Sequence, residues 1–204
     1  SDGVISGAQD AIGICVPGLA RHYYDQRFWP VKIETCSDEK VLSWLEEHLC
    51  LIPMFPRRPG CSVVEGKDIT LPKVKALAKA ADDCWNAILD MDPDRFAAAY
   101  KASFEAQVAM FPGMVNPTST DGATTENPSS HIQKGIAQGD LTSAKSSEEE
   151  FLPSVQAYID EYSRMPGVLA WKMPGAGGGG YLALVCTSRH TFPKGAIEIT
   201  VRRG

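Results

Sequence analysis

One stretch of the sequence decides the expected fold: Met173-Pro-Gly-Ala-Gly-Gly-Gly-Gly-Tyr-Leu-Ala-Leu-Val-Cys186. Five of the six residues from 175 to 180 are glycine, and the strand-like run Tyr181–Ser188 follows them directly. Each glycine costs about 0.5–1 kcal/mol relative to alanine in regular structure, so this composition indicates a compensating role. Close approach of the backbone to a ligand, with amides turned toward an anion, is one such role, and a tight turn between two strands is the other.

The glycine spacing also matches a dinucleotide-binding pattern, but the context does not. Gly175, Gly177 and Gly180 fit G-x-G-x-x-G. That motif opens a helix, whereas a strand is predicted here, so a Rossmann site is not expected.

The residues on either side of this stretch predict a mixture of helices and strands. Alternating apolar and polar residues, or short apolar runs bounded by turn residues, indicate strands over Leu19–Tyr24, Trp29–Cys36, Cys50–Met54, Val168–Met173, Tyr181–Ser188 and Ala196–Val201. Helical spacing and capping residues indicate a helix from Ser6 to Pro17, one that begins at Ser37, and helices over 71–91, 93–111 and 148–165. The polar stretch 118–147 predicts a long surface loop or insert. The pattern as a whole is that of an α+β fold.

The two central helices are expected to form an antiparallel pair, because only a short break around Pro93 separates them. Their predicted core faces are Val74, Leu77, Ala81, Trp85, Ile88 and Leu89 in the first helix, and Phe96, Tyr100, Phe104, Val108 and Phe111 in the second.

Composition and charge exclude several classes of protein. The chain has 204 residues and a formal net charge of −5, and its only basic clusters are Arg57-Arg58 and Arg202-Arg203, so no nucleic-acid partner is expected. No apolar run is long enough to span a membrane, and no membrane partner is expected. The six cysteines and four histidines form no zinc-binding or redox motif, which predicts no metal site in this chain and buried free thiols in a reducing, cytoplasmic compartment.

A second motif lies near the start of the chain, at Ser6-Gly7-Ala8-Gln9-Asp10-Ala11-Ile12-Gly13. It resembles the segment that carries the catalytic aspartate in GHMP kinases, and Met173–Cys186 resembles the third conserved motif of the same family. The likeness is greatest to the heptose 7-phosphate kinases, the fucokinases and the galactokinases, and it covers most of the chain except the insert at 118–147.

This resemblance implies a particular domain organisation. Residues 1–36 would be the end of an N-terminal kinase domain, and residues 37–204 the C-terminal domain of ferredoxin-like kind. The family's nucleotide loop, Pro-x-x-x-Gly-Leu-x-Ser-Ser, is absent from this sequence. The resemblance therefore implies that ATP and Mg²⁺ are bound mainly by a missing N-terminal half, and that this chain alone is inactive.

The resemblance also implies roles for individual residues. Asp10 would be the catalytic base that accepts the proton of a sugar hydroxyl, and the dipole of its helix favours a carboxylate there. Ser6, Gly7 and Gln9 would bind the sugar or sugar phosphate. Gly175, Ala176, Gly177, Gly178, Gly179 and Gly180 would form a loop that faces the phosphates or the substrate.

Other interpretations stay open at this level. The chain could be a non-catalytic sugar-binding or regulatory module derived from such a kinase, or an unrelated ferredoxin-like domain in which the glycines form only a turn. Asp10 could be a surface carboxylate or a helix cap. Arg57 and Arg58 are expected in a solvated loop, with a clamp for an anionic substrate as the alternative.

Overall fold

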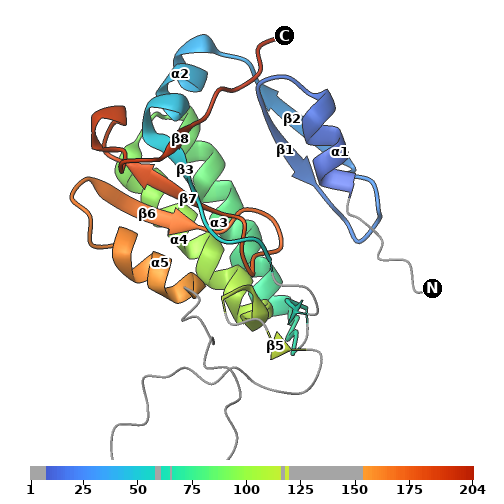
Figure 1. The fold of residues 1–204 in the computed structure, drawn as a ribbon. Helices are drawn as coiled ribbons and strands as arrows, with labels where there is room; N and C mark the ends of the chain where they lie inside the picture. The colour runs from blue at the N-terminus through green and yellow to red at the C-terminus, as the bar shows by residue number, and fades with distance from the viewer. Residues whose placement is uncertain (1–7, 58–60, 65, 116–117, 120–153) are drawn as a thin grey trace, which may run out of the picture.

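The computed structural model describes residues 8–57, 61–64, 66–115, 118–119 and 154–204 (Figure 1). Within these ranges the α-helices are α1 (Ala8–Cys15), α2 (Glu39–His48), α3 (Leu71–Leu89), α4 (Pro93–Met110) and α5 (Val155–Tyr162). The strands are β1 (Leu19–Tyr23), β2 (Lys32–Cys36), β3 (Leu49–Pro53), β4 (Cys61–Ser62), β5 (Thr118–Ser119), β6 (Val168–Lys172), β7 (Tyr181–Cys186) and β8 (Ile197–Glu198). Short 3₁₀ turns cover Pro112–Met114 and Arg189–Thr191. The chain has an α+β fold with antiparallel sheets, as predicted.

The central sheet has four strands in the order β6-β7-β3-β8. Strand β7 is antiparallel to both β6 and β3, so β6 and β3 run in the same direction with β7 between them. Likewise, β7 and β8 are both antiparallel to β3 and therefore parallel to each other. Strands β3 and β7 are thus the two inner strands of the sheet. The glycine segment 174–180 directly precedes β7 and therefore lies at the end of an inner strand.

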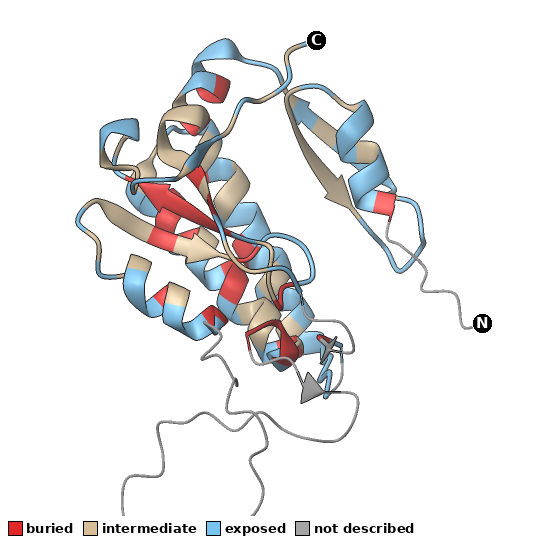
Figure 2. Cartoon of the chain, in the orientation of Figure 1, coloured by how far each residue is buried: buried red, intermediate tan, exposed pale blue. Residues whose placement is uncertain are grey.

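Apolar side chains alternate across this sheet and form two cores, one on each face. The first core joins Cys50 and Ile52 of β3 and Leu182, Leu184 and Cys186 of β7 to Val155 and Ile159 of α5. The second joins Ala170 of β6 and Val185 of β7 to Leu45 of α2, Ala87 of α3, and Phe96 and Ala97 of α4. Helix α5 contributes to the first core and α3 to the second, whereas α4 contributes to both, through Phe104 in the first and Phe96 and Ala97 in the second. Burial is most continuous along β7, which Figure 2 shows in red over most of its length.

Helices α3 and α4 form the predicted antiparallel pair. Asp92 caps α4 by accepting a hydrogen bond from the Arg95 amide at 3.0 Å, and Pro93 occupies the first turn, where its missing N–H costs nothing. Met91, in the connection, has a positive φ of 54°. The core face predicted for α4 is confirmed, since Phe96 and Phe104 are buried and the other three aromatic or apolar residues are partly covered.

The core face predicted for α3 is confirmed only in part: Leu77, Trp85 and Ile88 are half-buried, but the other three predicted residues are exposed. Val74 and Leu89 are exposed, whereas Ala80 and Ala87 are buried against the neighbouring helix and sheet. Helix α4 packs closely along α3, and small alanine side chains permit this approach better than the larger residues on the adjacent stripe.

Three predicted boundaries also shift. Helix α2 is capped by Asp38 rather than Ser37, because the Asp38 carboxylate accepts a hydrogen bond from the Lys40 amide at 2.8 Å. Helix α5 begins after Ser154, whose hydroxyl accepts from the Ala157 amide at 3.1 Å, and not at residue 148. Residues 148–153 lie outside the described residues, as does the predicted insert at 118–147 except for β5, which pairs with β4. The last predicted strand is reduced to β8.

The first 29 described residues form a separate small unit of α1, β1 and β2, which we call the N-terminal unit (residues 8–36). Among the described residues, its two strands pair with each other and with no further strand. Large apolar side chains remain exposed on it, including Ile14 at 72% and Trp29 at 62% of full exposure, together with Phe28, Val31 and Ile33. A two-stranded sheet with so little buried surface is marginally stable alone, so contacts with residues 37–204 must hold this unit in place.

No helix within the described ranges is long and apolar enough to cross a membrane. The cysteines for which the structure gives a state are free: Cys15, Cys36, Cys50, Cys84 and Cys186. Cys50 and Cys186 are buried as expected, whereas Cys15 is exposed at the end of α1, contrary to the expectation of buried thiols.

Candidate functional site

The glycine segment forms the connection from β6 to β7, as predicted. Gly175, Gly177, Gly178, Gly179 and Gly180 all have positive φ, between 69° and 142°. Residues other than glycine rarely adopt such values, so the backbone path itself explains much of the composition.

Hydrogen bonds dock this loop onto two neighbouring segments. The Gly178 amide donates to the Met114 carbonyl at 2.8 Å, and the Gly180 amide donates to the Phe55 carbonyl at 2.8 Å. The amide of Met54 in turn donates to the Gly180 carbonyl at 2.8 Å. Two of the loop amides are therefore used inside the protein and are not turned toward a ligand.

Arg57 adds a further contact that the sequence did not indicate. Its guanidinium donates to the Gly177 carbonyl through Nε at 3.1 Å and Nη2 at 2.9 Å. The neighbouring Arg58 lies outside the described residues. Arg57 is exposed in a loop, as expected, and its guanidinium also holds the glycine loop.

A side chain at Gly177 or Gly179 would collide with neighbouring atoms of the protein. A Cβ atom at Gly179 would lie 2.8 Å from the Phe55 carbonyl oxygen and 2.9 Å from the Arg57 nitrogen. A Cβ at Gly177 would lie 2.8 Å from the Met114 Cβ. Packing against the protein is therefore a sufficient reason for glycine at residues 177–179, and the approach of a ligand to them stays a prediction.

The first part of the loop differs from the rest. Gly175 and Ala176 are exposed, and a Cβ at Gly175 would meet nothing within 4 Å. Gly175 and Ala176 together, which we call the loop tip, are the part of the predicted phosphate or substrate loop that a ligand can reach. The docked residues 177–180 hold this tip in a fixed position.

Asp10 lies in the first turn of α1, and its side chain is exposed, as is that of Gln9. Ser6 and Gly7, the other predicted substrate-binding residues, lie outside the described residues. No hydrogen bond or ion pair joins Asp10 to the glycine loop within the described ranges, and Figure 1 shows α1 in the N-terminal unit, to one side of the central sheet. The structure therefore does not bring the two predicted halves of the site into contact.

The C-terminal residues Val201–Gly204 connect the N-terminal unit to the rest of the chain, and we call them the terminal strap. On one side, Arg202 Nη2 donates to the Cys15 carbonyl at 2.7 Å, and the Gly18 amide donates to the Arg202 carbonyl at 2.8 Å. Because Cys15 ends α1, the Arg202 cation also lies at the negative end of that helix's dipole.

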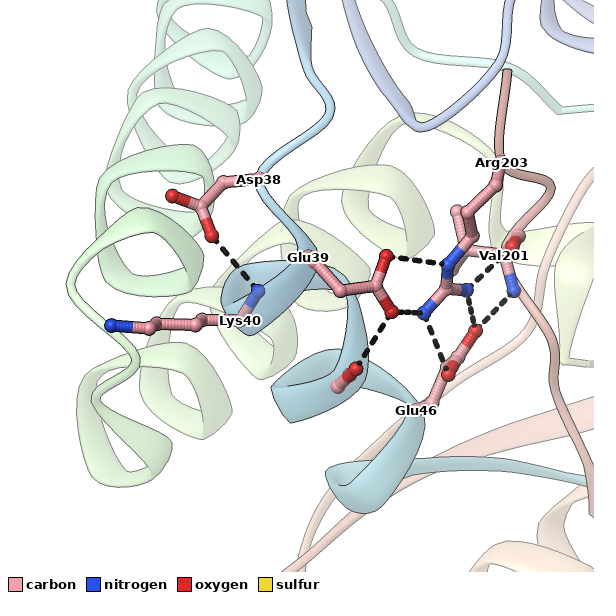
Figure 3. Close-up of polar contacts among 7 residues, drawn as sticks. Asp38, Glu39, Lys40, Glu46, Val201 and Arg203 are labelled. Carbon is pink, nitrogen blue, oxygen red and sulfur yellow. Dashed lines mark hydrogen bonds and ion pairs between the residues drawn. The ribbon is translucent and has the colours of Figure 1, made fainter.

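On the other side, the strap is bound to α2 (Figure 3). Arg203 donates to Glu39 at 2.7 Å and 3.1 Å and forms a second ion pair with Glu46. The Val201 amide donates to Glu46 Oε1 at 2.6 Å. The hydrogen bonds from Arg203 lower the pKa of both Glu39 and Glu46, and they raise the pKa of Arg203. From the sequence, Arg202-Arg203 is recognisable only as a basic cluster, because its acidic partners are more than 150 positions away in the chain.

Within the part of the chain that the structure describes, no group of three or more His, Cys, Asp or Glu side chains is arranged to hold a metal ion. The comparisons with known proteins add no relative: no family model matches this chain, and no curated protein matches it.

Proposed function

We propose that this chain is the C-terminal portion of an ATP-dependent small-molecule kinase of the GHMP type, which transfers the γ-phosphoryl group to a hydroxyl of a sugar or sugar phosphate. The observation that carries the proposal is the rigidly docked glycine loop between two antiparallel strands, with its tip exposed. Transfer of a phosphoryl group depends mainly on positioning and on stabilisation of charge, and a fixed loop with a reachable tip is suited to positioning.

The topology of the central sheet supports this proposal at the level of the fold. The parallel strands β3 and β6 flank β7, and the helices α3, α4 and α5 lie in the connection between them. This is a split β-α-β arrangement, the basis of the ferredoxin-like plan. The second half follows the same plan with β7 and β8, except that a single 3₁₀ turn, Arg189–Thr191, replaces the second helix.

In the proposed reaction, Asp10 accepts the proton of the attacking hydroxyl, and Ser6, Gly7 and Gln9 orient the acceptor. The exposure of Asp10 leaves its carboxylate available to a substrate. The loop tip at Gly175 and Ala176 limits where the acceptor or the phosphates can lie. Because α1 and the loop tip are not in contact, the proposal requires substrate between them.

ATP and Mg²⁺ are proposed to be bound mainly by an upstream half of the same polypeptide, in the cytoplasm. The described residues offer no acidic cluster for Mg²⁺, so the proposal assigns no metal ligand to this chain. The exposed apolar side chains of the N-terminal unit, such as Phe28 and Trp29, suit it to pack against that half.

The alternative is a non-catalytic sugar-binding or regulatory module derived from such a kinase. The separation of Asp10 from the glycine loop favours this alternative, because a catalytic centre needs its groups within reach of one substrate. A third possibility, an unrelated ferredoxin-like domain, is favoured by the use of the loop amides inside the protein.

The test uses the full polypeptide and compares Asp10→Asn with Asp94→Asn. Asp94 is a matched control, because it is also an exposed aspartate in the first turn of a helix, α4. If Asp10 is the base, Asp10→Asn lowers kcat for phosphorylation of the preferred hexose or heptose phosphate by about 10²–10⁴, while Asp94→Asn leaves it near the wild-type value.

Three outcomes would separate the candidates. A fully active Asp10→Asn protein would remove Asp10 from the mechanism. If the wild-type protein consumes no ATP with any hexose or heptose phosphate but binds one of them in calorimetry, the binding module is correct. If it neither consumes ATP nor binds a sugar, both the kinase and the module are excluded.

A further inference from the structure

Strand β2 (Lys32–Cys36) is an open edge of the N-terminal unit, to one side of the central sheet (Figure 1). Within the described ranges its strand partner is β1, and no other backbone hydrogen bond joins β2 to the described chain. An edge strand with free N–H and C=O groups is a template on which another strand can pair. The proposed kinase site does not use this edge.

Strand β1 faces the rest of the chain more closely than β2 does. Arg21 of β1 forms an ion pair with Asp82 of α3. All five residues of β1 are half-buried, whereas Lys32, Ile33 and Thr35 of β2 are exposed. Strand β2 is therefore the more accessible strand of the pair.

The two faces of β2 differ in their chemistry. Lys32 forms an ion pair with Glu34, and Glu34 accepts a hydrogen bond from the Tyr23 hydroxyl at 2.6 Å, so both charged side chains lie on one face. Val31, directly before β2, and Ile33 lie on the other face by alternation, and they keep 50% and 41% of their full exposure. The edge thus combines a charged face with a β-branched apolar face, and both suit pairing with another strand.

The sequence of β2 is complementary to itself when two copies pair in antiparallel orientation about Ile33. Lys32 of each copy then lies directly opposite Glu34 of the other copy. On the other face, Ile33 lies opposite Ile33, and Val31 lies opposite Thr35. Opposite charges and β-branched residues directly across from each other are cross-strand pairs that stabilise a sheet.

The charges also select this register among its neighbours. A two-fold axis normal to the sheet keeps every side chain on its own face only if the axis passes through a pair of identical residues. Centring the pair on Lys32 would place two ammonium groups opposite each other, and centring it on Glu34 would place two carboxylates there. Of these three registers, the one centred on Ile33 alone brings opposite charges together.

We propose that β2 is a homodimerisation edge, on which a second copy of this chain adds its own β2 to give a four-stranded sheet in the order β1-β2-β2-β1. Both copies use the same residues, as in any two-fold symmetric interface. Because two short strands bury little surface, the dimer is transient and its population depends on protein concentration.

Sedimentation equilibrium of the 204-residue chain, from low micromolar to several hundred micromolar, tests the proposal. The wild type should change from monomer toward dimer over this range. Lys32→Glu replaces both cross-strand attractions by repulsions, so it should raise the dissociation constant by about 5–30-fold. Lys79→Glu is the matched control, because Lys79 of α3 is also an exposed lysine paired with an acid, Asp83, and the change in net charge is the same.

A mixture of two variants tests the register itself. Lys32→Glu carries two acids at the paired positions and Glu34→Lys carries two lysines, so each variant repels itself, whereas the two together restore opposite charges at every pair. The mixture should therefore associate more tightly than either variant alone. If circular dichroism shows that Glu34→Lys, which also loses the Tyr23 hydrogen bond, does not fold, the comparison of Lys32→Glu with Lys79→Glu decides.

The proposal is overturned if the wild-type chain stays monomeric at every concentration, in which case the edge is open to a strand of another polypeptide. It is also overturned if Lys32→Glu associates like Lys79→Glu, or if the mixture of folded variants associates no better than its components. None of these measurements involves ATP or a sugar, so they test this edge independently of the proposed function.

Discussion

At the scale of the residue, the positions of the glycine loop require glycine for different physical reasons. Gly175 needs a positive φ of 69° but has open space around its α-carbon. Gly177 has a φ of 78°, and a Cβ atom added there would lie 2.8 Å from the Met114 Cβ. The sequence alone could predict the loop, but it could not show which glycines are also required by close packing. The Met114 contact that decides this at Gly177 joins residues more than 60 positions apart.

This division leads to a prediction about stability. Gly175→Ala should lower the free energy of unfolding by about 1–2 kcal/mol, the cost of a left-handed conformation for a residue with a Cβ. Gly177→Ala should lower it by roughly 1–3 kcal/mol more, because Met114 must move to accommodate the added methyl group. Urea unfolding of both variants measures the difference. Equal losses at the two positions would show that the Met114 contact does not constrain the loop.

At the scale of the element, most helices and strands were predictable because periodicity and caps are local signals. The pair α3 and α4, with its break at Pro93, and the strand–loop–strand around the glycines are confirmed. The exposed stripe of α3 was not predictable, because the larger residues Val74 and Leu89 gave a stronger pattern than the alanines that pack. The start of α2 was missed by one residue, since Ser37 and Asp38 are both good caps and only geometry selects between them.

The ion pairs of the terminal strap with α2 predict a dependence of stability on pH. Hydrogen bonds from Arg203 lower the pKa of Glu46 from its ordinary value of 4.5, so the unfolded chain takes up a proton at Glu46 before the folded chain does. The stabilisation is therefore fully present above pH 4.5 and is lost as the pH falls through the lower, folded-state pKa. Its size should be below about 1 kcal/mol, because solvent screens these partly exposed groups.

The melting temperature of the wild type should accordingly fall more between pH 5 and pH 3 than that of Glu46→Gln, which cannot titrate at this position. Glu161→Gln, on the exposed surface of α5, serves as the control and should follow the wild type. If Glu46→Gln and the wild type lose the same number of degrees, the Arg203 pair does not contribute to folding.

At the scale of the whole molecule, the sequence predicted the α+β class but not how the two ends of the chain meet. The candidate site was predictable in its motifs: Asp10 near a helix start and the glycines between two strands are both where the patterns placed them. Their separation was not predictable, because it depends on how the N-terminal unit lies relative to residues 37–204. That arrangement is fixed by long-range contacts such as Arg202 to Cys15.

The terminal strap leads to a final prediction about the N-terminal unit. In the part of the chain that the structure describes, β1 and β2 form ladder pairs with each other and with no other strand, and the unit leaves many apolar side chains in solvent, so its own contacts give it little stability. Besides the strap, Arg21 of β1 forms an ion pair with Asp82 of α3. Replacing both Arg202 and Arg203 by alanine removes the hydrogen bond to Cys15 and the bridge to Glu39 and Glu46 together.

Amide hydrogen exchange in the Arg202→Ala/Arg203→Ala variant should therefore increase over residues 16–36, while exchange in β3 and β7 stays at the wild-type level. Residues 16–36 respond because local opening of a weakly held unit controls their exchange, whereas the central strands open only with the whole sheet. Arg189→Ala is a suitable control, because it removes ion pairs to Glu47 and Glu198 at the other side of α2 and does not touch the strap. Faster exchange across the entire chain would mean that the two arginines stabilise the whole fold, and unchanged exchange over residues 16–36 would mean that the packing of β1 alone holds the unit.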